Sequence, residues 1–178
     1  MKKHFFAFAL ICTLSLNPGC EKTLTESELE IHGRRDYVWV VDTLKASPGD
    51  LFYLFSLWGS SPHDIWAVGS ADAADLSKWH FDGISWKQDN IRLSSNLMSV
   101  YGFAKNDVWA CDAPGLGVYH YNGQQWSTSY SYNESGTRLG LNNIWGETTN
   151  NIYAVGSIDS VSGGSYKGAI LHYDGNNW

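Results

Sequence analysis

Cysteine and proline are scarce in this chain of 178 residues, which has three cysteines and four prolines. Cys12 and Cys20 lie near the N-terminus, so a domain beyond them has Cys111 alone and forms no internal disulfide. Charged residues make up 17% of the sequence, below the usual ~25%. The packing of uncharged side chains must therefore hold the fold together.

Basic residues are also few, and the formal net charge is -6. Lys2 and Lys3 are the basic residues of segment 1–19, so the rest of the chain has ten basic and eighteen acidic residues. This balance argues against a nucleic-acid-binding surface, which is usually basic. No apolar run of about 20 residues follows the N-terminus, so the sequence predicts no membrane-spanning helix.

The N-terminus combines a basic start with a short apolar stretch, Phe5 to Leu16, and then Gly19-Cys20. This order resembles a bacterial lipoprotein signal, in which a small residue precedes the cysteine that becomes lipidated. The resemblance implies a signal peptide at 1–19, a lipid on Cys20 and a polar tether at 20–36. It also implies export and a membrane anchor at the outer membrane or cell surface. An ordinary signal peptide that is cleaved nearby is the alternative.

Glycine, tyrosine and tryptophan are abundant, at eighteen, ten and nine residues, and they follow an internal repeat. Its first half reads Trp58-Gly59, four residues, then Asp64-Ile65-Trp66-Ala67-Val68-Gly69. The same pattern recurs around Trp109 and Tyr153, after 43 and 44 residues. All nine tryptophans fall on the template, which predicts that most of them pack between sheets.

The second half of the repeat reads Trp79-His80-Phe81-Asp82-Gly83, two residues, then Trp86, with copies that end at Trp126 and Trp178. Asp-Gly or Asn-Gly between two apolar segments is a strong hairpin signal. Each copy therefore predicts four short strands, which is typical of a β-propeller blade. We expect an all-β fold with blades at about 51–91, 97–132 and 140–178.

The two halves together resemble a family of exported bacterial propeller repeats over about residues 37–178. One motif is Trp-Gly, four residues, then Asp, Ile or Val, and Trp-Ala-Val-Gly. The other is His-Tyr-Asp-Gly, two residues, then Trp. The resemblance implies the fold and no single activity. The second copy departs from the pattern at Cys111-Asp112, where Val-Gly is expected.

Three blades are too few for a closed ring, which usually has about 4–8. Segment 37–44 matches the strand that begins at Trp86, so we predict that it closes a ring by pairing with the last blade. The chain is then either a truncated reading frame or an open form that self-associates through an unpaired blade edge.

The connections between the predicted strands predict a binding face. The first and second strands of a copy keep one spacing, whereas the second and third are separated by nine, six or fourteen residues. Variable loops on one face of a repeat protein are typical of a binding surface. The candidate binding residues are Asp72, Asp75, Tyr130, Tyr132, Asn133, Glu134, Asp159, Ser165 and Tyr166.

No residue pattern predicts catalysis, a metal or a cofactor. His80, His120 and His172 hold one template position that lies too far from the propeller axis for a shared ion, so a repeated structural hydrogen bond is predicted. We expect Asp64, Asp107 and Asn151 to cap turns. The predicted function is a non-enzymatic envelope module that binds a protein or a glycan. A structural or assembly protein and a polysaccharide-acting enzyme are the alternatives.

Overall fold

The computed structural model describes residues 38–178 except 46, 74–75, 90–92, 95, 116 and 165. The predicted signal peptide, the lipidation site Cys20 and the tether at 20–36 lie outside the described residues. The chain divides into two units, one up to Asp42 and one from Thr43 onward. Among the described residues, no helix is long and apolar enough to cross a membrane.

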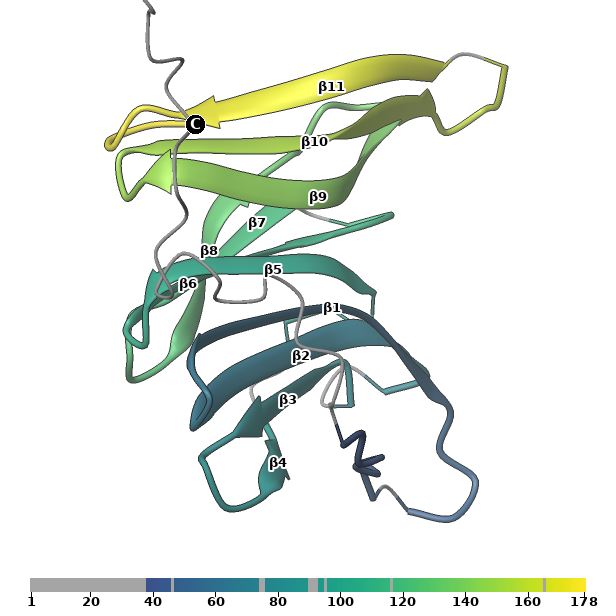
Figure 1. The fold of residues 1–178 in the computed structure, drawn as a ribbon. Coiled ribbons are helices and arrows are strands. Elements are labelled where there is room, and N and C mark those ends of the chain that lie inside the picture. Colours follow the sequence, from purple (N-terminus) through teal and green to yellow (C-terminus); the bar gives the residue numbers. More distant parts are fainter. Residues whose placement is uncertain are drawn as a thin grey trace, which may run out of the picture. The chain divides into compact units, whose positions relative to one another are not determined.

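The second unit is built of three antiparallel sheets that follow one another along the chain (Figure 1). The first sheet has the order β1-β2-β3-β4 and the second the order β5-β6-β7-β8, while the third has the order β11-β10-β9. The strands are β1 (Phe52–Ser61), β2 (Asp64–Ala71), β3 (Lys78–Phe81), β4 (Trp86–Gln88), β5 (Leu97–Ala104), β6 (Asp107–Asp112), β7 (Gly117–Tyr121), β8 (Trp126–Ser131), β9 (Thr137–Thr148), β10 (Asn151–Ser160) and β11 (Tyr166–Tyr173). This arrangement confirms the predicted all-β fold and fits an incomplete propeller.

The repeat in the sequence becomes a repeat in strand register. Trp66 pairs with Trp58 in the first sheet, and Trp109 pairs with Tyr101 in the second. In the third sheet, Tyr153 pairs with Trp145. Because cross-strand partners point to the same face of a sheet, equivalent residues of the three copies face the same way.

The first and second sheets pack through one apolar cluster. From the first sheet come Trp66 and Val68, and the second contributes Val100, Ala110 and Trp126 among others. The rings of Trp66 and Trp126 meet edge to face, with centroids 5.2 Å apart. Such contacts bury large aromatic area between neighbouring blades.

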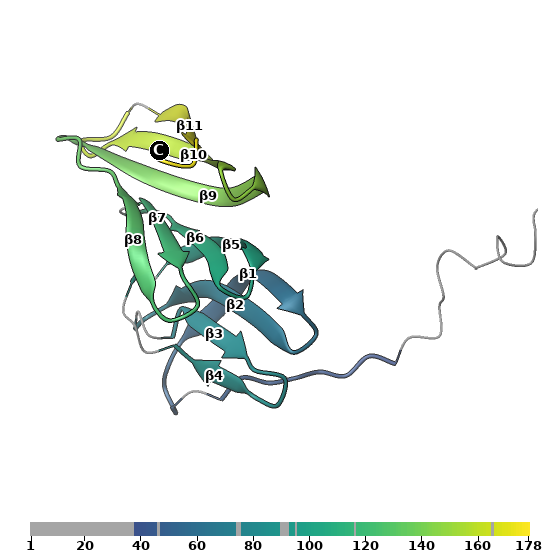
Figure 2. The same cartoon turned by 90° about the vertical axis from the view of Figure 1, so that its left-hand side faces the viewer.

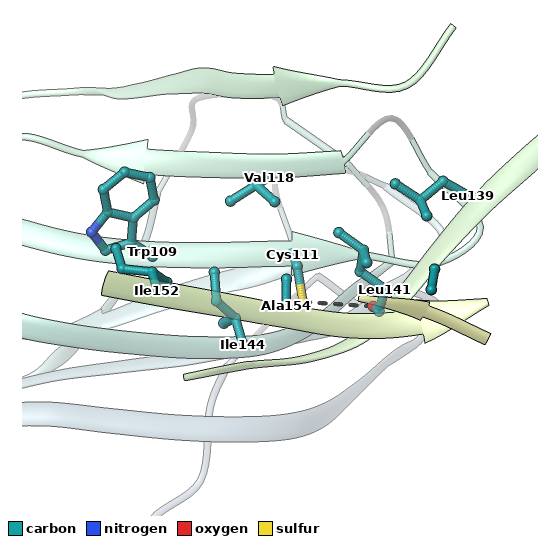
Figure 3. Close-up of a cluster of buried hydrophobic side chains, with 9 residues drawn as sticks. Trp109, Cys111, Val118, Leu139, Leu141, Ile144, Ile152 and Ala154 are labelled. Carbon is teal, nitrogen blue, oxygen red and sulfur yellow. Dashed lines mark hydrogen bonds between the residues drawn. The ribbon is translucent and has the colours of Figure 1, made fainter. Parts of the chain in front are cut away.

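The second and third sheets pack in the equivalent way (Figures 2 and 3). Trp109, Cys111 and Val118 of the second sheet contact residues of the third, among them Leu141 and Ala154. The Cys111 thiol donates a hydrogen bond to the Leu141 carbonyl over 3.6 Å. The predicted packing role is thus confirmed for the buried tryptophans, whereas Trp39 and Trp145 are largely exposed.

Residues 38–45 have no regular secondary structure. The pairing predicted for 37–44 requires the last blade of a closed ring, so the closing strand stays a prediction. Leu44, in the second unit, packs against a cluster of the first sheet that contains Ala67, Leu76 and Trp79.

The Cys111 thiol is expected to resist alkylation in the folded chain. Burial, and next the negative charge of Asp112, raise its pKa to about 12, so the reactive thiolate is scarce at neutral pH. Iodoacetamide at pH 8 should leave Cys111 unmodified in native conditions and modify it in urea, as read by peptide mass mapping. Rapid modification without denaturant would contradict the tight packing against Leu141.

Candidate functional site

The three template histidines each bind a residue of their own sheet. His80 Nε2 lies 2.6 Å from Asp64 Oδ1, and His120 Nε2 lies 2.8 Å from Asp107 Oδ1. In the third sheet, His172 Nε2 lies 2.8 Å from Asn151 Oδ1. The repeated structural hydrogen bond predicted from the sequence is therefore confirmed.

Each of these imidazoles also stacks on an aromatic ring of the neighbouring strand. The centroid distances are 4.4 Å for Trp66 and His80, 4.1 Å for Trp109 and His120, and 4.4 Å for Tyr153 and His172. The residues the structure describes contain no group of three or more side chains placed to hold a metal ion. The hydrogen bonds and ring stacks of the histidines join the second and third strands of each sheet.

A hollow of about 520 Å³ lies at the strand ends away from the histidine contacts, where the variable loops connect the strands. We call it the Asp112 hollow. It lies where the β6–β7 loop meets the β4–β5 loop and the start of β9. Its lining comprises Leu93, Ser94, Asp112, Pro114, Gly115, Tyr119 and Arg138.

Asp112 is buried at the end of β6, and its carboxylate is held from two sides. Oδ1 accepts a hydrogen bond from the Gly117 amide at 2.9 Å, and Oδ2 accepts one from the Tyr119 hydroxyl at 2.8 Å. A Cβ on Gly115 would lie only 1.9 Å from the carboxylate, so the loop can close over Asp112 only with glycine there. The hollow thus has a fixed acidic wall.

The pKa of the Tyr119 hydroxyl is raised by its place in the hollow. Its burial raises the pKa of its hydroxyl above the usual range, and the charge of Asp112 adds to the increase. The hydroxyl therefore stays protonated at neutral pH and continues to donate to Asp112.

A second hollow of about 380 Å³ lies beside the first, and the two share Pro114 and Arg138. We call it the Asp159 hollow. Its lining comprises Met98, Ala113, Pro114, Arg138, Gly140, Asn142, Ser157 and Asp159. The side chains come from β5, the β6–β7 loop, β9 and β10, so this hollow spans the junction of the second and third sheets.

Arg138 and Asp159 are direct partners in the pairing of β9 with β10. Asp159 Oδ1 is buried and has no hydrogen-bond partner among the described residues. Arg138 is exposed and lines both hollows. A buried acceptor without a partner is uncommon in proteins.

Of the residues predicted for binding, Asp159 lines a hollow, whereas Asp75 and Ser165 lie outside the described residues. Tyr130 and Tyr132 are partly buried against the cluster between the second and third sheets, and the Tyr132 hydroxyl hydrogen-bonds to Thr137 Oγ1 at 2.9 Å. These two tyrosines thus contribute to packing. Asp72, Asn133, Glu134 and Tyr166 are exposed and line neither hollow.

Sequence reasoning missed Asp112, Tyr119 and Arg138. For Asp112 a signal was present, because Cys111-Asp112 replaces the Val-Gly of the repeat. Tyr119 matches the repeat. Arg138 lies in the variable connection before the third copy of the repeat. Neither residue therefore departs from the repeat pattern.

Comparison with known proteins gives little more than a distant likeness. No protein-family model matches the chain, and no curated protein matches it. Among solved structures, "YCF48 bound to D1 peptide" has 18% sequence identity and a TM-score of 0.46. The match covers 72% of this chain and 46% of that one, so this chain spans less than half of that protein. No family assignment follows.

Proposed function

We propose that the chain is a non-enzymatic binding module of the bacterial cell envelope, and that the two adjoining hollows take a segment of a partner protein. The proposal rests on one observation. Arg138, exposed on the variable-loop face, joins a hollow walled by Asp112 to a hollow with an Asp159 oxygen that has no partner among the described residues. Both hollows lie on the face that the loop lengths favour for binding.

The chemistry of the lining favours a peptide over a sugar. A guanidinium pairs well with a carboxylate, and a buried carboxylate oxygen pairs with an amide or ammonium donor. Sugars are often bound by stacking on exposed aromatic rings. Tyr119, the aromatic residue of the two linings, is buried and donates its hydroxyl to Asp112. The expected ligand is therefore an extended segment with an acidic group for Arg138 and a donor for Asp159.

A binding role also fits the carboxylates better than catalysis does. The Asp112 carboxylate is committed to the Gly117 amide and the Tyr119 hydroxyl, which orients it but uses both oxygens. The N-terminal sequence supports the envelope location, because Gly19-Cys20 after an apolar stretch resembles a lipoprotein signal.

A displayed library of random peptides, selected on the purified chain, tests this proposal. We expect selected peptides to share an acidic residue, and Arg138→Ala to weaken their binding about tenfold or more by calorimetry, because a charge-assisted pair is lost. Arg138→Lys should retain part of the affinity. Asp159→Asn should weaken it independently.

Lys105→Ala is the matched control, because Lys105 is an exposed cation in the β5–β6 turn at the other end of the strands. Its peptide affinities should equal those of the unchanged chain. Peptides that bind equally well after Arg138→Ala and Asp159→Asn would refute the proposed site. A library that yields no binders, beside a neutral glycan that binds, would refute the peptide ligand.

A further inference from the structure

One interface between blades occurs twice within this chain, and its two halves recur at the outer faces of the first and third sheets. In each interface, a sheet inserts side chains from its second strand into the inner strands of the next sheet. The inserted side chain is Val68 of β2 between the first and second sheets, and Cys111 of β6 between the second and third. Both side chains are fully buried.

The inserting half is exposed on the outer face of the third sheet. Val155 has the register position of Val68 and Cys111, yet 41% of its surface is exposed. Ile170 has the position of the fully buried Val118, yet it is 73% exposed. We call this the donor face; it comprises Trp145, Tyr153, Val155 and Ile170.

The receiving half is exposed on the outer face of the first sheet. Leu57 has the register position of Val100 and Ile144, which are buried by the preceding sheet, and yet it is 64% exposed. An open hollow of about 230 Å³ lies there, lined by Leu54, Phe55, Ser56, Leu57 and Ala67. We call this the acceptor face. The equivalent places in the second and third sheets receive Val68 and Cys111.

A polar contact repeats along with the apolar ones. Ser56 Oγ accepts a hydrogen bond from the Val100 amide at 3.1 Å, and Ser99 Oγ accepts one from the Ile144 amide at 3.3 Å. In the third sheet, Asn143 stands where Ser56 and Ser99 stand in the first two. Its side-chain oxygen Oδ1 accepts a hydrogen bond from Ser99 Oγ at 3.1 Å, so Asn143 extends the polar contact between the second and third sheets.

We propose that two copies of this chain associate head to tail, the donor face of each seated on the acceptor face of the other. The occupant is a second copy because this chain carries both halves of an interface that it already forms twice. Two copies supply six blades, within the usual range of about 4–8 for a closed ring. Closure with two-fold symmetry uses the same contact twice and leaves neither apolar face exposed.

The ring also gives the predicted closing strand a partner. The third sheet ends at β11, beside which no strand pairs among the described residues. Segment 38–44 precedes the first sheet and matches the sequence of a fourth strand, and Val38, Val40 and Val41 are exposed. In the pair of copies, this segment of one chain adds to β11 of its partner. Amide exchange in β11 should then slow on association, and Val40→Pro should restore fast exchange.

Light scattering on the full chain, over a dilution series, tests the association. We expect a particle of twice the chain mass, and a monomer after either Val155→Glu or Leu57→Glu. Both side chains are exposed in the single chain, so both variants should keep its circular dichroism. Ile84→Glu is the matched control, because Ile84 is 90% exposed in the β3–β4 turn and outside both faces; it should remain a dimer.

Mixing the two monomeric variants is the decisive step. The Val155→Glu chain keeps its acceptor face and the Leu57→Glu chain keeps its donor face, so the mixture should form a heterodimer through one intact interface. A monomeric unchanged chain would overturn the proposal. So would a dimer that survives Leu57→Glu but not Val155→Glu, because this result would indicate two donor faces in contact. Particles larger than a dimer would overturn ring closure.

Discussion

Replacing Trp109 with alanine is expected to lower the free energy of unfolding by about 3–5 kcal/mol. The indole is 4% exposed, and it stacks on His120 and contacts Tyr173 of the third sheet at a centroid distance of 5.3 Å. Its Nε1 donates to Asp107 Oδ1 at 2.7 Å. Truncation therefore leaves a cavity where two sheets meet and removes a hydrogen bond from Asp107. Because a domain has only about 5–15 kcal/mol of stability, the loss should be obvious in urea.

Two further variants show whether position or residue type causes this loss. Trp109→Tyr, which copies the Tyr153 of the third repeat, should cost less than the alanine variant because a ring remains on His120. Trp145→Ala should cost well under 1 kcal/mol, since Trp145 is 53% exposed. All three are best measured in the monomeric Val155→Glu background, so that association does not contribute. Equal costs at both tryptophans would contradict the packing described for Trp109.

The repeat could be read from the sequence because the same residues determine both the strands and their packing. The motif around Trp66 contains the aspartate that starts β2, the alternating apolar residues of the strand and the glycine beside the inner strand. The copies of this motif accordingly coincide with β2, β6 and β10, which begin at Asp64, Asp107 and Asn151. The turn signals at Gly83 and Gly123 predicted the hairpins, and both glycines have positive φ.

Strand lengths in the third sheet were harder to predict. The third blade was expected to start at about residue 140, whereas its inner strand β9 runs over Thr137–Thr148. The additional residues pair with the end of β10, with Thr137 opposite Ser160. Their polar sequence has no strand pattern of its own. Cross-strand pairing therefore decides where these two strands end, and a single-sequence pattern does not contain that information.

The candidate site was predictable as a face but not as a set of residues. Loop lengths predicted a binding face, and both hollows lie among the variable connections of that face. The hollows themselves form where β5, the β6–β7 loop, β9 and β10 meet, and that depends on how two sheets pack. Asp112 was visible only as a departure from the repeat. In a repeat protein, such a departure at a buried position indicates a local role that the other copies do not share.

Asp112→Ala is expected to cost about 2–4 kcal/mol of stability, because it leaves two buried donors without their acceptor. These donors are the Gly117 amide and the Tyr119 hydroxyl. Tyr119→Phe should cost less, about 1–2 kcal/mol, since it removes the hydrogen bond to Asp112 but preserves the ring. Tyr121→Phe is the control on the same strand and should stay within about 0.5 kcal/mol.

The double variant tests whether Asp112 and Tyr119 act as a pair. Once Phe replaces Tyr119, no hydroxyl is left unsatisfied by Asp112→Ala, so the double variant should be more stable than the summed losses predict, by about 1–2 kcal/mol. Additive losses would mean that the hydroxyl has another acceptor.

The alkaline limb of the stability profile gives an independent measure of the same pair. The folded-state pKa of Tyr119 is raised above its unfolded value of 10.0, first by burial and then by the charge of Asp112. Its contribution to stability is therefore complete below pH 10 and decreases as the pH rises toward the folded-state pKa. Tyr119→Phe should make this decrease shallower, and Asp112→Ala should do so in part, because burial remains when the charge is removed. An unchanged slope in both variants would show that the Tyr119 hydroxyl is not buried beside Asp112, and the acidic wall of the hollow would then lack its second support.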